Sequence, residues 1–193
     1  MAKKNKSNTS PPKFIRLLRE CSSLALLGVS LYLVLIFYGY DRADPGWSST
    51  SGANPIQNQG GHVGAWLADV LLYLFGISAW LWVLFFISLV SLGYRSINTV
   101  RIFDRRPLLV SAAGFIAFLA SSSGLEALQL YPPNIYLPYK PGGMLGNIIA
   151  ENLPQALGLT GSTLALLTLL AIGFSLFTGL SWLRLVEKIG SII

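Results

Sequence analysis

Four long runs of residues without a charged side chain alternate with more polar segments along the chain. The runs are 19, 25, 19 and 24 residues long, and they cover residues 22–40, 70–94, 107–125 and 160–183. A helix needs roughly 20 apolar residues to cross the hydrocarbon core of a bilayer. None of the runs alternates apolar with polar residues as a barrel strand does. The pattern therefore predicts an all-α integral membrane protein with a bundle of four transmembrane helices.

Lysine and arginine are distributed unevenly among the segments that flank these runs. Six lie before the first run and four in the segment 95–106, whereas the longer segments 41–69 and 126–159 hold one each. Cytoplasmic loops carry the excess of Lys and Arg, so we expect both termini in the cytoplasm and the two longer loops in the periplasm. The net charge of +6 would then face anionic lipid headgroups. We expect no direct nucleic-acid contact from the basic leader, residues 1–21.

The two longer loops are expected to contain structure of their own. The first is rich in turn-forming residues, and its end, Val63–Asp69, predicts a helix that leads into the second run. In the second loop, apolar residues from Met144 to Leu153 recur at helical spacing and predict a short helix, either on the outer face of the membrane or packed under the loops. Loops of 29 and 34 residues usually have a function. We interpret them as partner-binding, with folding onto their own bundle as the alternative.

The composition argues against several functions. Charged residues make up 11% of the chain, against about 25% in soluble domains. The four runs contain no Asp, Glu, Lys, Arg or His, which disfavours an ion-coupled transporter. Cys21 is the single cysteine, so the chain cannot form an internal disulfide. His62 is the single histidine, and a metal site would need more ligands than it supplies. Without a phosphate-binding loop or a nucleophile elbow, we expect no catalytic, cofactor or metal site in this segment.

Small residues recur at every fourth position in the last two runs, which places them on single helix faces. Such faces let membrane helices approach closely, either within one bundle or between copies or partner proteins. The candidate packing residues are Gly76, Ala113, Ala117, Ser121, Ala171, Ser175 and Gly179. Trp80 and Trp82 fall near the middle of the run 70–94, although tryptophan prefers the membrane interface. We expect them to pack against small-residue faces or a neighbouring subunit.

Several motifs resemble those of the FtsK family. The segments that carry the resemblance are Asp44–Ser48 (DPGWS), Asn58–Asp69 (NQGGHVGAWLAD), Leu74–Gly76 (LFG), Pro141–Gly146 (PGGMLG), Leu176–Trp182 (LFTGLSW) and Glu187–Gly190 (EKIG). They extend over nearly the whole chain, from about Arg19 to Gly190. The block 58–69 and the exit of the fourth run are the more specific of these motifs.

The resemblance implies the N-terminal four-span membrane domain of a cell-division DNA translocase. In that family the domain lies in the bacterial inner membrane at the division septum and takes part in assembling the division machinery. It tethers a linker and a hexameric motor that uses ATP and Mg to pump double-stranded DNA. Residues 184–193 are interpreted as the start of that linker. A homo-oligomer, other division proteins and membrane lipids are the implied partners of this domain.

Two alternatives to a septal anchor stay open at this stage, a free-standing membrane scaffold without a motor and a small transporter. For partner binding, the candidates are Trp47, Gly60, Gly61, Trp66 and Asp69. Tryptophans are typical anchors of protein interfaces, and glycines permit positive φ or close backbone approach. Asp69 is expected either to cap the second helix or to pair with a partner.

Overall fold

The computed structural model describes residues 13–49, 55–95, 106–129 and 137–179, and within these ranges all regular structure is helical. The elements are α1 (Lys13–Tyr38), α2 (Gly61–Phe75), the 3₁₀ helix η1 (Gly76–Trp80), α3 (Leu81–Arg95), α4 (Arg106–Gln129) and α5 (Gly143–Thr178). Four helical stretches are long and apolar enough to cross a membrane: Glu20–Tyr38, Gly61–Ser91, Leu109–Gln129 and Gly143–Thr178. The predicted all-α architecture with four spanning helices is confirmed.

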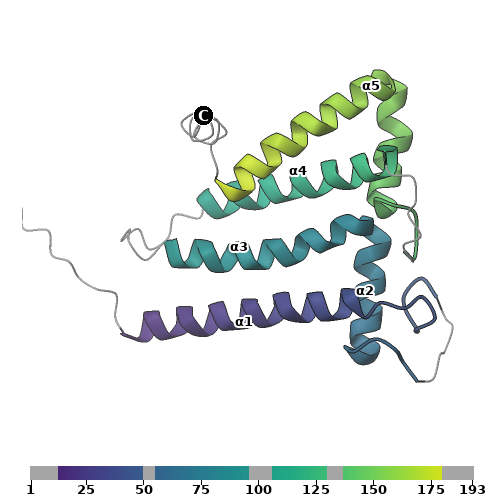
Figure 1. The fold of residues 1–193 in the computed structure, drawn as a ribbon. Coiled ribbons are helices and arrows are strands. Elements are labelled where there is room, and N and C mark those ends of the chain that lie inside the picture. The colour runs from purple at the N-terminus through teal and green to yellow at the C-terminus, as the bar shows by residue number, and fades with distance from the viewer. Residues whose placement is uncertain (1–12, 50–54, 96–105, 130–136, 180–193) are drawn as a thin grey trace, which may run out of the picture.

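The long helices run side by side, and α2 lies across one end of them (Figure 1). We call this end, with the loop after α1, helix α2 and the first part of α5, the loop end. The start of α1 and the end of α5 lie at the opposite end, which we call the terminal end. The described part of the chain thus enters and leaves the bundle on the same side, as an even number of crossings requires.

The run 70–94 is not a single helix. Residues 70–75 complete α2, and the chain turns through η1 before α3 begins at Leu81. The break occurs because Gly76 adopts φ +62° and ψ −139°, a conformation open essentially only to glycine. Trp80 and Trp82 therefore lie near the loop end of the crossing helix rather than at its middle. This position agrees with the preference of tryptophan for the membrane interface.

Helix α5 has two arms that meet at Gly158, where φ is +68° and ψ is 170°. Pro154, four residues earlier, lies inside the helix and removes one backbone donor. The first arm, residues 143–157, lies across the loop end, and the second arm, residues 159–178, runs back along α4 (Figure 1). The predicted short helix before the fourth span is confirmed, and it is continuous with that span across the kink.

Two apolar clusters form the core. The first joins α1, α2, η1 and α3 around Ile36, Ala68 and Leu72. The second is aromatic and joins α3, α4 and α5, with Phe85 and Phe115 centred 4.4 Å apart and Phe115 and Phe177 5.3 Å apart. Most of the surface of the spanning helices remains outside both clusters. Large apolar side chains are therefore free to face lipid or another chain.

The close approach of α4 to α5 uses glycines that the fourth-residue rows do not contain. A Cβ on Gly114 would lie 2.5 Å from the backbone nitrogen of Phe177, and one on Gly173 would lie 2.6 Å from that of Phe118. Of the predicted rows, Ser121 is buried, Ala117, Ala171 and Ser175 are half-buried, and Ala113 and Gly179 are exposed. Gly179 instead ends α5 in a left-handed C-cap.

Some predictions lie outside the described residues. They concern most of the basic leader, the loop between α3 and α4, and the tail 184–193.

Candidate functional site

The loop after α1 is held by one buried carboxylate, Asp44. Its two oxygens accept hydrogen bonds from the backbone nitrogens of Gln57 and Asn58, each at 2.8 Å. The Asn58 amide then donates to the carbonyl of Ile36 at the end of α1, at 2.9 Å. The Asn58 side-chain oxygen also accepts from the Gly60 nitrogen at 2.8 Å. The segment before α2 is thereby tied to the last turn of α1.

A second buried carboxylate, Asp69 on α2, is only 3% exposed. It accepts hydrogen bonds from the backbone nitrogen of Ser48 at 2.5 Å, from the Ser48 hydroxyl at 2.8 Å and from the Tyr40 hydroxyl at 3.0 Å. Burial, followed by the charge and the hydrogen bond of Asp69, raises the pKa of Tyr40 above its ordinary value of 10.0. Asp69 lies inside α2 and pairs with its own loop, so capping is not its role here.

The paired glycines before α2 serve two different steric needs. Gly61 has φ +63°, and a Cβ added there would meet nothing within 4 Å. At Gly60 φ is −80°, but a Cβ would lie 2.5 Å from Cγ2 of Ile36 and 2.8 Å from Cα of Gly64. Gly61 thus permits the turn, while Gly60 permits α2 to approach α1. The structure gives both candidates a role inside the chain, and their contact with a partner stays a prediction.

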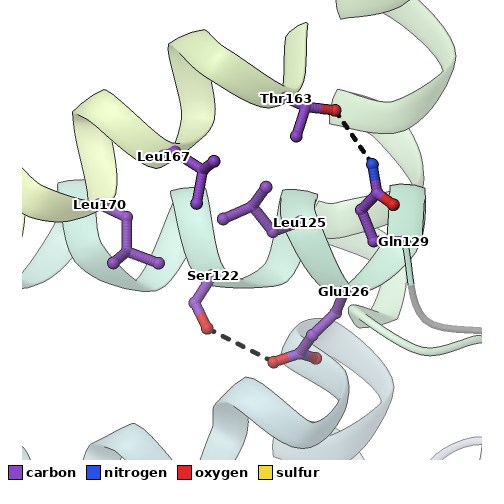
Figure 2. A pocket seen from close by; sticks show the side chains of 7 residues that line it. All are labelled: Ser122, Leu125, Glu126, Gln129, Thr163, Leu167 and Leu170. Carbon is purple, nitrogen blue, oxygen red and sulfur yellow. Dashed lines mark hydrogen bonds between the residues drawn. The ribbon is translucent and has the colours of Figure 1, made fainter. Parts of the chain in front are cut away.

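A third carboxylate, Glu126, joins three elements that are distant in sequence. It accepts hydrogen bonds from the backbone nitrogen of Ser78 in η1 at 3.2 Å and from that of Gly142, before α5, at 3.1 Å. The hydroxyls of Ser78 and Ser122 donate to the same carboxylate, and Figure 2 shows the Ser122 contact. In the sequence, Glu126 falls in the predicted loop 126–159. The one feature that marks it there is its position directly after the uncharged run 107–125.

Gly76 marks the closest backbone contact at the loop end. A Cβ there would lie 2.5 Å from the nitrogen of Gly142 and 2.6 Å from that of Gly143. Gly142 and Gly143 themselves have φ of +78° and +65°. The first arm of α5 therefore starts directly against the break between α2 and η1. Gly76 was predicted to permit close packing of neighbouring helices, and the close contact that it permits is with the turn before α5.

Candidate partner-binding tryptophans remain exposed at the loop end. Trp47 and Trp66 are 55% and 49% exposed. Trp47 stacks edge-on against Tyr73, which in turn contacts Tyr139, with ring centroids 5.0 and 5.1 Å apart. A groove of about 470 Å³ lies beside Trp66 and is lined by Pro45, Gly46, His62 and Val63. We call Trp47, Val63, Trp66, Tyr73 and Tyr139 the aromatic surface.

The carboxylates of the loop end are used within the fold itself. Backbone and hydroxyl donors of the chain itself bind each of the three carboxylates, of which Asp44 and Asp69 are buried and Glu126 is half-buried. Within the described ranges, no group of three His, Cys, Asp or Glu side chains could hold a metal ion. The buried polar contacts give the loop end a defined shape, on which Trp47, Val63 and Trp66 of the aromatic surface are exposed.

The comparisons with known proteins agree on one family. The model of the 4TM region of DNA translocase FtsK/SpoIIIE matches residues 15–190. The chain is 42% identical over 186 residues to DNA translocase FtsK 2 of Ralstonia nicotianae, covering 94% of this chain and 24% of that protein. It is 34% identical over 162 residues to DNA translocase FtsK of Shewanella oneidensis, covering 84% and 18%.

The chain therefore spans about a quarter or less of the length of these curated relatives. No solved structure matches it significantly. The matched region contains α1 from its third residue, the helices from α2 to α5, and every contact of the loop end described above. The chain belongs to the family of four-transmembrane regions of FtsK/SpoIIIE DNA translocases.

Proposed function

We propose that this chain is the inner-membrane anchor and divisome-interaction domain of a septal DNA translocase. The observation that carries the proposal is the family match over residues 15–190. The relatives that it resembles are named DNA translocases and are several times longer. In this proposal the ATP- and Mg-dependent motor and its DNA contacts belong to the longer protein. The segment itself binds neither cofactor nor nucleic acid.

The proposed orientation puts both termini in the cytoplasm and the loop end in the periplasm. The distribution of Lys and Arg supports it, with twelve of fourteen in the leader, the middle loop and the tail. The start of α1 and the end of α5 at one end of the bundle also agree with it (Figure 1). A motor attached after α5 would then work on the side of the membrane that contains the chromosome.

The aromatic surface is the proposed contact for other division proteins. Exposed tryptophans are typical centres of protein interfaces, and Trp47 and Trp66 are both about half exposed. Asp69, by contrast, is buried and bonded to Tyr40 and Ser48, so its contribution to recruitment would be through the shape of the loop. The same proposal includes a homo-oligomer of this domain, which would be a hexamer if the domain has the same number of copies as the motor.

A small transporter is the less favoured alternative. The four uncharged runs contain no ionisable group that could bind a coupling ion. The helical stretches of spanning length are longer than these runs, however, and they include Asp69, Glu126 and Glu151. They are found there because helices at the loop end continue past the uncharged runs. Asp69 and Glu126 hold turns together, and Glu151 is exposed. These roles in shaping the loop end favour an anchor over an ion pathway, and a free-standing scaffold is the other alternative.

The test is a fluorescent fusion after Ile193, imaged in dividing cells of the source bacterium. We expect a band at the septum, which would mean that this segment carries the information for recruitment. Uniform fluorescence around the envelope, with intact fusion on a gel, would contradict the proposal. Trp47→Ala and Trp66→Ala should weaken the band without changing fusion abundance. Tyr32→Ala, at another half-exposed aromatic residue outside the aromatic surface, is the matched control.

A further inference from the structure

The first arm of α5 packs on α4 along only part of its length. Ile149, Leu153 and Leu157 follow one another at intervals of four residues and form an apolar stripe on one side of the arm. Ile149 lies against α4, since a Cβ added to Gly124 would be 2.9 Å from its Cγ2 atom. Leu153 is half-buried, and Leu157 is 53% exposed. The stripe therefore continues beyond the part of the arm that contacts the bundle.

The stripe lies on the side of the arm that is turned towards the spanning helices. Gly124 belongs to the spanning stretch Leu109–Gln129, so its contact with Ile149 identifies that side. The backbone of the arm stays helical as far as Gly158. Residues at intervals of four share a helix face, and Leu157 thus points to the same side of the arm as Ile149. This is the side that faces the membrane.

The opposite side of the arm is polar. Gln155 precedes Leu157 by two positions, which is about 200° of rotation at 3.6 residues per turn. Glu151 shares the side of Gln155, and both are exposed. The Asn147 amide donates a hydrogen bond to the Glu151 carboxylate at 2.6 Å, and the Lys140 ammonium donates to the Asn147 side-chain oxygen at 3.2 Å. A line of polar groups therefore runs along the side that faces away from the membrane.

The length of the second arm sets the depth of the first. Residues 159–178 rise about 30 Å at 1.5 Å per residue, and the hydrocarbon core of a bilayer is also about 30 Å thick. Since the second arm is the part that crosses the core, Gly158 lies at the outer boundary of the hydrocarbon. The first arm lies across the loop end (Figure 1), so it extends along that boundary rather than through the core.

Polarity excludes a position fully in water or fully in hydrocarbon. All residues from 155 to 160 are exposed, among them Leu157 and Leu159, so the bundle leaves the kink uncovered. In water these leucines would be unprotected apolar surface. A carboxylate inside the hydrocarbon is costly, which keeps Glu151 out of the core. The boundary between headgroups and hydrocarbon suits both sides of such a helix.

We propose that the first arm of α5 lies in the surface of the bilayer, with Leu153 and Leu157 against the acyl chains of the phospholipids and with Glu151 and Gln155 in water. Its first turns pack on α4, and its last turns rest on lipid. The inference requires that the second arm spans a membrane, but it does not depend on septal recruitment. Its failure would leave the proposed function unaffected, and the reverse also holds.

The direct test measures the depth of single spin labels on the 193-residue chain in vesicles of phosphatidylethanolamine and phosphatidylglycerol. The one cysteine, Cys21, is exposed, so Cys21→Ser provides the background for labelling. Labels at Leu157→Cys and Gln155→Cys are compared by their collision rates with oxygen, which concentrates in hydrocarbon, and with a nickel chelate, which stays in water. We expect the ratio of the oxygen rate to the nickel rate to be several-fold higher at Leu157→Cys.

A third label and two outcomes make this test decisive. Leu164→Cys, at an exposed position of the second arm, supplies the reference value for hydrocarbon. Equal nickel collision rates at Leu157→Cys and Gln155→Cys would mean that the arm stands in water. Low collision rates with both reagents at Leu157→Cys would mean that protein, such as a second copy of the chain, covers the stripe. Either result would overturn the proposal.

A second measurement uses the unsubstituted chain, so it does not depend on the folding of the labelled variants. A phospholipid with a diazirine next to the glycerol ester is compared with one that carries the diazirine at the end of its acyl chain, and labelled residues are mapped by mass spectrometry. Leu157 should be labelled several-fold more by the first lipid. Leu169, near the middle of the second arm and 39% exposed, should be labelled more by the second. Equal labelling of Leu157 by both lipids, or by neither, would refute its position at the boundary.

Discussion

The loop end and the α4–α5 pair are held together by different kinds of contact. At the loop end, carboxylates accept hydrogen bonds from backbone nitrogens at turns of the chain, as Asp44 does from Gln57 and Asn58. Between α4 and α5, the contacts are glycines against backbone and rings against rings, as in Phe115 with Phe177. One interhelical hydrogen bond there joins the Ser111 hydroxyl to the Phe177 carbonyl at 3.0 Å.

The difference follows from where backbone donors are left without a partner. Inside a helix each N–H is satisfied four residues back, so two long helices need only shape to pack. Where a helix begins, its first N–H groups have no partner in the helix. Glu126 supplies an acceptor to two such nitrogens, of Ser78 and Gly142. The loop end should therefore tolerate single substitutions less well than the helix pair.

The largest expected effect is at Gly76. Gly76→Ala should lower the free energy of unfolding by about 4 kcal/mol, because strain at this φ/ψ and overlap with Gly142 add together. Gly61 has the same φ within one degree but open space around it, so Gly61→Ala should cost only about 1–2 kcal/mol. SDS-induced unfolding in bicelles measures both. Equal costs would show that the close contact at Gly76 contributes nothing.

The next effect concerns the carboxylate that joins η1, α4 and α5. Glu126→Ala should cost about 3 kcal/mol in the same unfolding measurement, because two backbone nitrogens lose a charged acceptor. Glu151 is an exposed acid of the first arm of α5 that pairs with Asn147, and Glu151→Ala should change stability by less than about 0.5 kcal/mol. If the two variants were equally stable, the loop end would not depend on Glu126.

A smaller effect is expected at Asp69. Asp69→Ala should cost about 2 kcal/mol, since the Ser48 nitrogen and the Tyr40 hydroxyl lose their acceptor. Asp41 is exposed and accepts one local hydrogen bond from Ala43, so Asp41→Ala is the control. Proteolysis of the loop after α1 gives an independent readout, with faster cleavage expected only in Asp69→Ala. Unchanged cleavage together with unchanged stability would contradict the role given to Asp69.

The helix pair provides the contrast. Ser111→Ala removes one hydrogen bond to Phe177, and polar contacts between membrane helices average about 0.6 kcal/mol. We expect a cost of that size in SDS-induced unfolding, well below the cost of Glu126→Ala. A loss of about 3 kcal/mol at Ser111 would remove the distinction between the two regions.

The last prediction concerns how stability depends on pH at Tyr40. Its pKa is raised in the folded state, so the full stability is present below the unfolded value of about 10 and declines as pH rises above it. Tyr40→Phe should decline less between pH 9.5 and roughly 11 than wild type, because the phenol that must lose its proton is gone. Identical pH profiles for the two proteins would contradict the shift.

The sequence determined the fold class because its signals are local. Uncharged runs of sufficient length predict spanning helices whatever surrounds them, and the four stretches are found. The short helix before the fourth span was also predicted, since apolar spacing from Met144 to Leu153 and Pro and Gly near its ends are local features. The candidate partner surface was anticipated in part, through the exposed Trp47 and Trp66.

Tertiary structure decided which residues meet. Hydropathy treats residues 70–94 as one run, whereas in the structure the chain turns at Gly76, where the lack of a side chain lets Gly142 and Gly143 approach. Likewise, the sequence predicts that Glu126 lies in a loop. Its role follows only from the fold, which brings Ser78 and Gly142 to it from 48 and 16 residues away. Spacing along one helix fixes which residues share a face, but not which face another helix covers, because that depends on packing between distant segments.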